Sequence, residues 1–212
     1  MKRKIVTKLM AIVLAGVLLT GSVTPGFHMS RVQAAEDLFN TRYDFNFEDG
    51  IEGWYYGEGW EYQYNGAKPT LESDTENGRM KIAVDFSQDA DKNWSNIAAC
   101  WKSEEGIDLS GVTQISMDIW YETEKLTEGE LKLAFYSNCG IDVNTSLIDV
   151  QEEEGTGLTK ARAVFGFPAI GSDAVTDLAV KIVGCNTGYS GAVWIDNIQF
   201  EAKDSETGDE SE

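Results

Sequence analysis

The stretch Ile115–Tyr121, with the sequence ISMDIWY, decides the fold class of this chain. Its odd-numbered positions hold Ile, Met, Ile and Tyr, and its even-numbered positions hold Ser, Asp and Trp. Successive side chains of a β-strand point to opposite faces of its sheet. The alternation therefore predicts a strand with one buried apolar face and one more polar face.

Similar short segments, rich in Ile, Val, Phe, Trp and Tyr, occur on both sides of this strand, and turn signals such as Asp49-Gly50 and Asn77-Gly78 separate them. No segment has the pattern of a long amphipathic helix. About nine short strands at this spacing predict an all-β fold, an antiparallel β-sandwich formed by one domain over residues 36–203. The expected strands are Tyr43–Glu48, Glu61–Tyr64, Met80–Phe86, Asn96–Lys102, Gln114–Tyr121, Leu131–Ser137, Thr159–Phe165, Asp177–Val183 and Val193–Glu201.

The first 34 residues have the pattern of an export signal. The basic start Lys2-Arg3-Lys4 precedes the apolar run Leu9–Val23, and small residues around Ala34 offer a cleavage site. An uncleaved membrane anchor is the alternative, but the run is shorter than the ~20 residues that a span needs. We expect cleavage after Ala34 and a secreted, extracellular protein.

The charge of the chain excludes several classes of partner. The 212 residues include 17 Lys and Arg against 36 Asp and Glu, for a formal charge of −19. Five of the basic residues lie in the first 35 positions, so removing that segment leaves 12 bases against 36 acids, a charge of −24. Such a surface repels nucleic acids and anionic membranes, so we expect neither as a partner. We expect a monomer with a neutral ligand.

Common catalytic arrangements are also excluded by the composition. The only histidine, His28, lies in the segment expected to be removed, which excludes Ser-His triads and His-ligated zinc. The three cysteines, Cys100, Cys139 and Cys185, have no metal-type spacing. A Cys139–Cys185 disulfide and three small buried residues are both compatible with the sequence. The acidic tail at residues 204–212 has no apolar residue and is expected to be a disordered tail or linker.

Aromatic residues are most dense in residues 54–64, WYYGEGWEYQY, where six of eleven side chains are aromatic. A core strand would bury only one face of such a segment, and exposed rings beside polar groups suit the apolar faces of sugars. Core or edge positions are the alternative for Trp54, Tyr62 and Tyr64. We expect Trp60 to bind a carbohydrate.

Three further tryptophans are candidates for the same ligand. Trp94 and Trp101 are seven residues apart, so on a regular strand they face opposite sides, and a single bulge would reverse their assignment. Trp94 follows a loop-like segment and is the favoured exposed residue, with Trp101 as the second candidate. Trp120 lies on the more polar face of its strand and could form part of a binding platform or cover the edge of the core.

Two acidic patterns suggest other chemistry. The segment Glu72–Glu76, ESDTE, resembles the catalytic strand of some β-jelly-roll glycanases, but its interleaved residues are Ser and Thr and a turn follows, so we interpret it as a solvated turn. Glu48, at the end of the first expected strand, and Asp196, in the last one, could lie close together in a sandwich. Their carboxylates, with backbone carbonyls, would suit a structural Ca²⁺.

Several of these segments together resemble a known family. The opening Tyr43–Trp54, YDFNFEDGIEGW, resembles that of secreted carbohydrate-binding modules with a galactose-binding-like jelly roll, and Asp108–Gly111 before a strand is typical of them. The closing stretch Ile182–Ile198, IVGCNTGYSGAVWIDNI, is most similar to the mannan-binding modules appended to β-mannanases, carbohydrate-binding module family 27 and its neighbour family 23. The resemblance covers about residues 43–201.

The resemblance implies non-catalytic binding of β-1,4-mannan or glucomannan, with tryptophans stacked on the sugar rings, and a structural calcium at Glu48 and Asp196. Trp60 matches the first binding tryptophan, and Trp94 or Trp101 matches the second. A third aromatic residue is expected after Leu131–Ser137, where this chain has no Trp, and Tyr136 is the candidate substitute.

The sequence therefore predicts a secreted polysaccharide-binding module that would raise the local concentration of an attached or partner enzyme on its polymer. A small jelly-roll glycoside hydrolase or polysaccharide lyase is the second hypothesis. A surface adhesion or scaffold domain without sugar preference is the third.

Overall fold

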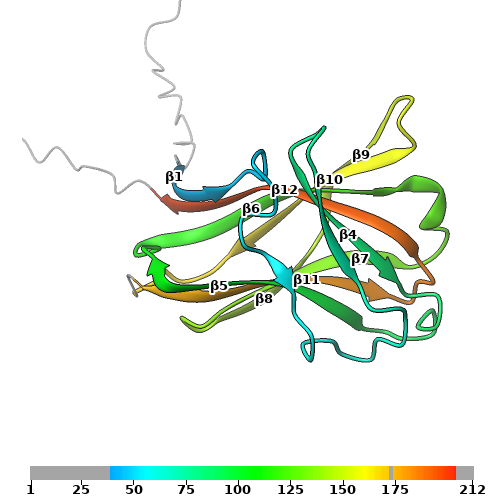
Figure 1. Cartoon of the computed structure of the whole chain (residues 1–212), viewed down its shortest axis with the longest axis horizontal. Coiled ribbons are helices and arrows are strands. Elements are labelled where there is room, and N and C mark those ends of the chain that lie inside the picture. The colour runs from blue at the N-terminus through cyan, green and yellow to red at the C-terminus, as the bar shows by residue number, and fades with distance from the viewer. Residues whose placement is uncertain (1–38, 172–173, 204–212) are drawn as a thin grey trace, which may run out of the picture. The chain divides into compact units, whose positions relative to one another are not determined.

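The computed structural model describes residues 39–171 and 174–203 (Figure 1). The expected export signal at residues 1–34 and the acidic tail at residues 204–212 lie outside the described residues. In the part that is described, no helix is long and apolar enough to cross a membrane.

The described residues form a sandwich of two antiparallel sheets, which lie as two layers in Figure 1. The first sheet has the strand order β3-β4-β12-β6-β10-β9, with β1 pairing along β12 beyond the end of β4, and the second has the order β2-β5-β11-β7-β8. The larger sheet contains β1 (Phe39–Phe45), β3 (Thr70–Asp74), β4 (Arg79–Asp85), β6 (Val112–Glu122), β9 (Ile148–Glu153), β10 (Leu158–Gly166) and β12 (Ser190–Lys203), and the smaller one contains β2 (Tyr55–Tyr56), β5 (Ser95–Ile107), β7 (Glu130–Ser137), β8 (Ile141–Ser146) and β11 (Val175–Cys185).

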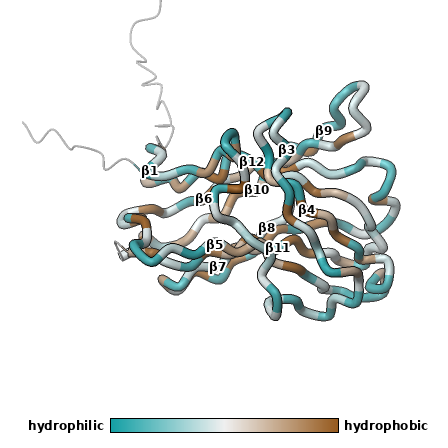
Figure 2. The backbone as a smooth tube through the Cα atoms, viewed as in Figure 1, coloured by the Kyte–Doolittle hydropathy of each residue, from teal (hydrophilic) through white to brown (hydrophobic). Residues whose placement is uncertain are grey.

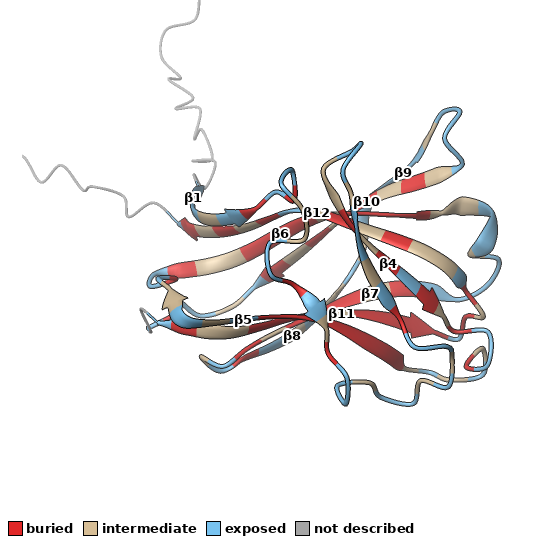
Figure 3. Cartoon of the chain, in the orientation of Figure 1, coloured by how far each residue is buried: buried red, intermediate tan, exposed pale blue. Residues whose placement is uncertain are grey.

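The core lies between the two sheets and follows from the alternation in the sequence. On β6 the side chains of Ile115, Met117 and Ile119 are at most 1% exposed and belong to the main core. Figure 3 shows buried segments along the central strands of both layers and exposed residues at the turns, and Figure 2 shows the matching change from hydrophobic strands to hydrophilic turns. The structure confirms the predicted all-β antiparallel sandwich.

The smaller sheet has an outer face, turned away from the core, that is unusually rich in small residues. On β5, Ile97, Ala99 and Trp101 point into the main core, so the alternate residues Ala98 and Cys100 point outward. The outward residues of the neighbouring strands include the small side chains of Ala134 and Ala179. We call this surface the five-strand face, and its central members are Ala98, Cys100, Ala134, Ala179, Lys181 and Val183.

Two expected strands differ from the structure. The first strand ends at Phe45, so Glu48 lies in the turn that follows. The expected strand Glu61–Tyr64 is reduced to a single bridge between Tyr62 and Asn96. The reason is local: Gln63 has a φ of 53°, in the left-handed region, which interrupts an extended strand.

Four edge strands were not expected from the sequence: β2, which has only two residues, and the three longer strands β3, β8 and β9. The segment Glu72–Glu76 was predicted to be a solvated turn, but Glu72–Asp74 belongs to β3 and only Thr75 to Gly78 forms the turn. Strands β8 and β9 were missed as well. Each of the three has one hydrogen-bonded neighbour and carries many polar residues, so its strand pattern is weak.

Candidate functional site

The aromatic segment of residues 54–64 forms the outer edge of the smaller sheet and loops over the five-strand face. Tyr55 and Tyr56 pair with β5, residues 57–61 leave the sheet, and Tyr62 returns to bridge Asn96. The loop begins at Gly57, whose backbone N–H donates to the carbonyl of Ala98 at 2.9 Å. A Cβ atom at Gly57 would lie 2.4 Å from the Cys100 sulfur, so only glycine lets the loop approach this closely.

This loop presents Trp60 to Tyr136. The two rings meet edge to face, with centroids 5.0 Å apart and an angle of 69° between the planes. Trp60 is 40% exposed, which is high for a large apolar ring that also contacts another ring. Tyr136 packs on a small buried cluster of Ala98, Cys100 and Ala179. Both rings therefore stand on the five-strand face, on a floor of small side chains.

Trp94 stands on the same face at a second position. It is half-buried and packs against Ala134, Val183 and Cys185, a cluster that is separate from the one beneath Tyr136. Ala179 and Val183, which belong to the two clusters, are four residues apart on β11, about 13 Å along the strand. Aromatic rings over two separate clusters on one face suit a chain of several sugar units better than a single sugar.

Polar groups lie between the aromatic positions. Lys181 pairs with Ala98 on one side and with Ala134 on the other, so two alanines leave open space around its side chain. Its ammonium nitrogen lies 5.7 Å from the centroid of the Trp60 ring, and none of the ion pairs among residues 39–171 and 174–203 involves it. Asn144 and Asp142 extend the polar set on the edge strand β8.

Two of the predicted binding tryptophans are elsewhere. Trp101 is 8% exposed and lies in the core between the sheets, where its ring contacts Phe45 at 5.6 Å. This placement corrects the expectation that Trp101 binds sugar, because its ring offers no free face. It agrees with the prediction that Trp94 and Trp101, seven residues apart, face opposite sides of the sheet.

Trp120 is also a correction. It lies on the outer face of the larger sheet, away from Trp60 and Trp94, and is 3% exposed. The Arg79 guanidinium covers its ring at 3.7 Å, and its indole N–H donates to Glu153 at 2.9 Å. A ring that is covered and hydrogen-bonded in this way is part of the folded sheet and is not free to stack on a ligand.

Within residues 54–64, the structure separates buried from exposed rings. Trp54 is 1% exposed and belongs to the core, and Tyr64 is half-buried with its ring edge to face with Phe86. Tyr55 and Tyr62 are exposed on either side of the loop that carries Trp60. The sequence left a core or edge position open for Tyr62 and did not single out Tyr55, although the density of rings was a signal for both.

The three cysteines are unpaired. Cys100 lies beneath Gly57 on the five-strand face, and burial raises the pKa of its thiol to about 11. Burial also raises the pKa of Cys185. The Cys139–Cys185 disulfide that the sequence allowed is therefore not formed, and Cys100 acts as a small packing residue under the site.

The two carboxylates expected to bind calcium lie near the place where β1 leaves β12. The pairing of Phe45 with Ile198 marks this place; Glu48 is exposed in the turn after β1, and Asp196 is half-buried on β12. Burial raises the pKa of Asp196, an effect that a hydrogen bond from the Asn197 N–H opposes. No group of three or more His, Cys, Asp or Glu side chains among the described residues is arranged to hold a metal ion. A cation here would depend on amide and carbonyl oxygens as well as on these two carboxylates.

Comparison with known proteins identifies the family. The family model of carbohydrate binding module 27 matches residues 32–203, most of the chain. No curated protein sequence matches. The site described above, with aromatic rings on an open sheet face, is the kind of surface on which a sugar chain can stack.

Solved structures of binding modules have a similar fold. TmCBM27, described in a study of specific mannan recognition, is 17% identical, with a TM-score of 0.59 over 79% of this chain and 99% of that one. The CBM27-1 module of Caldicellulosiruptor saccharolyticus, in complex with mannohexaose, is 17% identical, with a TM-score of 0.60 over 77% and 98%. A family 28 module specific for non-crystalline cellulose is 15% identical, with a TM-score of 0.56 over 74% and 92%.

At these identities the solved structures establish a shared fold. The match to the family model, which covers most of the chain, is what establishes the function. The glycanase hypothesis is not supported, because the matching family consists of binding modules without catalytic activity. The chain belongs to carbohydrate-binding module family 27 and is a non-catalytic, polysaccharide-binding β-sandwich.

Proposed function

We propose that this module binds β-1,4-mannan or glucomannan chains across the five-strand face. The observation that carries the proposal is the position of Trp60, Tyr136 and Trp94 on this one face, over two separate clusters of small residues whose members Ala179 and Val183 are about 13 Å apart along β11. An extended polysaccharide would stack on both groups, whereas a single sugar would reach only one.

The groups around the rings supply the polar contacts of such a complex. Lys181 would donate hydrogen bonds to sugar hydroxyls between the aromatic positions, and Asn144 and Asp142 would donate to or accept from hydroxyls at the edge strand. Each ring contact contributes on the order of 1 kcal/mol. Two or three such contacts supply about 2–3 kcal/mol, so the hydrogen bonds must supply the remainder of the ~8 kcal/mol that a micromolar dissociation constant requires.

The choice of mannan rests on the relatives. TmCBM27 was studied for specific mannan recognition, and the Caldicellulosiruptor saccharolyticus module was crystallised with mannohexaose. The acid-rich surface of this chain is also compatible with an uncharged polymer and unfavourable for an anionic one.

Affinity electrophoresis tests the proposal directly. The protein would be run through gels that contain galactomannan, glucomannan, xylan or a soluble cellulose derivative. We expect retardation by the two mannans and less or none by the others. Retardation by xylan or cellulose alone would show that the ligand is wrong, and a lack of retardation in every gel would overturn carbohydrate binding at this face altogether.

We further propose a structural Ca²⁺ held by Glu48 and Asp196. In its support, β1 and β12 pair up to Phe45 and Ile198, so the segments that carry both carboxylates begin from neighbouring strands. Carboxylate, amide and carbonyl oxygens are the ligands that calcium prefers. The melting temperature should fall in excess chelator and recover with added Ca²⁺, and the Glu48→Gln variant should lose this response. An unchanged melting temperature in chelator would contradict the proposal.

We propose finally that residues 1–34 direct export. The support is the basic start, the apolar run and the small residues near Ala34. Expression of the full chain in a secreting host should release a protein whose first residue is Ala35, as read by N-terminal sequencing. Retention of the intact chain in the cell would contradict export.

A further inference from the structure

Trp194 lies on the outer face of the larger sheet, on the side of the molecule opposite the five-strand face. It belongs to β12, where it pairs with Lys81 on β4 and with Trp120 on β6. Trp194 is half-buried. Unlike the covered ring of Trp120, it has no ring contact, cation contact or indole hydrogen bond with any other residue that the structure describes.

Trp194 is shared by two hollows on this face. The first, of about 570 Å³, lies between Trp194 and the β9–β10 turn and includes Glu122, Lys125 and Leu158. The second, of about 430 Å³, lies between Trp194 and the β3–β4 turn and includes Glu72 and Lys81. Hollows of this size are in the range of small-ligand sites. One free aromatic ring with a polar hollow on each side is an arrangement that can hold a chain of sugars.

The charges around Trp194 select the chemistry of the ligand. Five carboxylates and two ammonium groups line the two hollows, so an anionic chain would be repelled. The carboxylates of Glu72 and Glu122 each accept from a lysine, at 3.3 and 2.8 Å, and retain further acceptor positions. The surface thus combines a ring for an apolar sugar face with acceptors for hydroxyl groups. The other carboxylates are Asp74, Glu76 and Glu124, and the two ammonium groups belong to Lys81 and Lys125.

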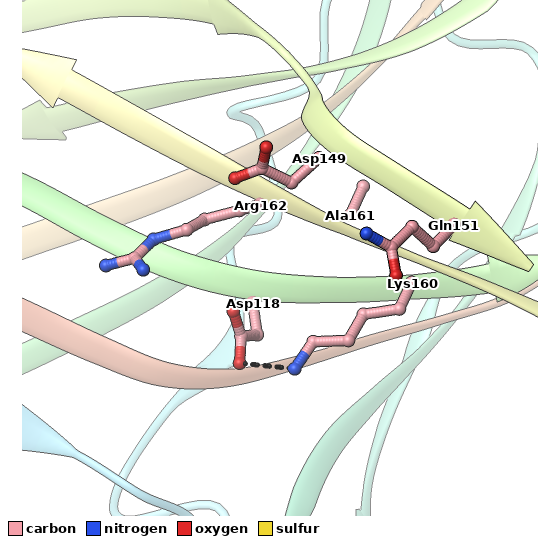
Figure 4. Close-up of a pocket in the computed structure, with 6 residues that line it drawn as sticks. All are labelled: Asp118, Asp149, Gln151, Lys160, Ala161 and Arg162. Atoms are coloured by element: carbon pink, nitrogen blue, oxygen red, sulfur yellow. Dashed lines mark ion pairs between the residues drawn. The ribbon is translucent and has the colours of Figure 1, made fainter. Parts of the chain in front are cut away.

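A neighbouring hollow on the same face lacks this combination. Figure 4 shows it between β9, β10 and β6, with Lys160 joined to Asp118 by an ion pair of 3.0 Å. Arg162 donates to the Ser116 hydroxyl at 2.9 Å. None of the residues that line this hollow is aromatic. It therefore offers hydrogen bonds without a stacking surface, and Trp194 marks the better site.

We propose that the outer face of the larger sheet is a second glycan-binding site, in which a neutral oligosaccharide stacks on Trp194 and extends into the hollows on either side. This site is independent of the five-strand face and goes beyond the mannan binding proposed for that face. With two sites on opposite sides of the sandwich, one module can bind two polysaccharide chains.

Nuclear magnetic resonance of the indole N–H groups tests this site residue by residue. The Trp60→Ala/Trp94→Ala variant removes both tryptophans of the five-strand face and leaves four indole signals. The Trp194→Phe variant identifies which of these signals belongs to Trp194. Mannohexaose and cellohexaose should each shift the Trp194 signal in a saturable manner, and an oligogalacturonide, which is anionic, should not. An unmoved Trp194 signal at saturating concentrations of both neutral hexasaccharides would overturn the proposal.

Calorimetry gives the second readout. The unmodified protein should bind two molecules of mannohexaose, and the Trp60→Ala/Trp94→Ala variant should bind one. Adding Trp194→Ala to that variant should weaken the remaining binding by about fivefold or more, the loss of one ring contact. Phe39→Ala, another exposed aromatic residue of the larger sheet, is the matched control and should change neither value. If the unmodified protein binds only one molecule of mannohexaose and the Trp60→Ala/Trp94→Ala variant binds none, the five-strand face is the only site and the second site is contradicted.

Discussion

The rings of Trp60 and Tyr136 meet edge to face, with centroids 5.0 Å apart, although the strands from which they come are not neighbours in the smaller sheet. Trp60 comes from the loop after β2, Tyr136 comes from β7, and the strands β5 and β11 lie between them. The loop can reach across because the residues beneath it are Ala98, Cys100 and Ala179. The binding platform therefore depends on small residues in the sheet as much as on the large rings above it.

Substitutions of Trp60 and Tyr136 should distinguish direct stacking on the sugar from support of the Trp60 ring. We expect Trp60→Ala to weaken mannan binding by about fivefold or more, since one stacking contact of on the order of 1 kcal/mol is lost. Tyr136→Phe keeps the ring and should have a small effect, whereas Tyr136→Ala should weaken binding because Trp60 loses its support. Isothermal calorimetry with mannohexaose measures all three. Equal affinities for Tyr136→Ala and the unmodified protein would contradict the supporting role of Tyr136.

The close approach of Gly57 to Cys100 predicts that a substitution at Gly57 weakens binding and that a second substitution at Cys100 restores it. In Gly57→Ala the new Cβ would lie 2.4 Å from the Cys100 sulfur, so the loop must shift and mannan affinity should fall, with a cost in stability of about 1–3 kcal/mol. In Gly57→Ala/Cys100→Ala the sulfur is gone, and the next nearest atom is the Ala98 oxygen at 3.4 Å. Affinity should then recover. A double variant that is as weak as Gly57→Ala would show that this contact does not position the loop.

The thiol of Cys100 should react slowly in the folded protein. Its pKa is raised to about 11 by burial, so at pH 8.5 well under about 1% is thiolate, the nucleophilic form. Iodoacetamide treatment followed by peptide mapping should modify Cys139, which is half-buried, before Cys100. In urea the two should react at similar rates. Rapid modification of Cys100 in the native protein would mean that the loop over it opens readily.

Lys181 should contribute to affinity without contributing to stability. It stands between two alanines, near the ring of Trp60, and has no ion pair within the described residues. We expect Lys181→Ala to weaken mannohexaose binding and leave the melting temperature unchanged. Lys160→Ala is a matched control, because that lysine lies on the other sheet, away from the five-strand face, and is paired with Asp118 at 3.0 Å. Equal binding losses in both variants would indicate a general charge effect instead of a contact.

The stability of the sandwich should fall in acid partly through Glu122. Burial alone would raise the pKa of this carboxyl, but hydrogen bonds from Lys125 and from the Ala192 N–H outweigh it and lower the pKa. A lowered folded-state pKa means that the charged form stabilises the protein above the unfolded pKa of about 4.3, and that this contribution is lost as the pH falls through the folded pKa. Urea unfolding of the Glu122→Gln variant should show a smaller loss of stability below about pH 4.3 than the unmodified protein shows. An identical loss in both proteins would contradict this role.

The parts of the fold that could be predicted from the sequence are those with a strong local pattern. The alternation in Ile115–Tyr121 was sufficient to predict β6 and its buried face, and the seven-residue spacing placed Trp94 and Trp101 on opposite sides. The edge strands β8 and β9 were missed because an edge strand needs little apolar sequence, although each pairs with its neighbour in the chain, β8 with β7 and β9 with β10.

The composition of the site was less predictable because it depends on strand order. Trp120 was correctly assigned to the more polar face of its strand, but no local pattern shows that β6 belongs to the larger sheet, away from Trp60. The contact between Trp60 and Tyr136 likewise depends on the register of β11 with β7, in which Ala179 pairs with Tyr136. Such long-range pairings have no signature in a single sequence. The sequence therefore predicted which face of its strand a residue occupies, but it did not predict which residues that side chain would contact.

The most direct test of the central claim is the affinity for mannohexaose of the Trp60→Ala/Trp94→Ala variant, measured by calorimetry beside the Phe39→Ala control. The binding isotherm of the unmodified protein should contain a component that is lost in the double variant and kept in the control, while both variants stay folded with melting temperatures near that of the unmodified protein. If the double variant binds mannohexaose with the same affinity and the same number of sites as the unmodified protein, mannan does not bind at the five-strand face.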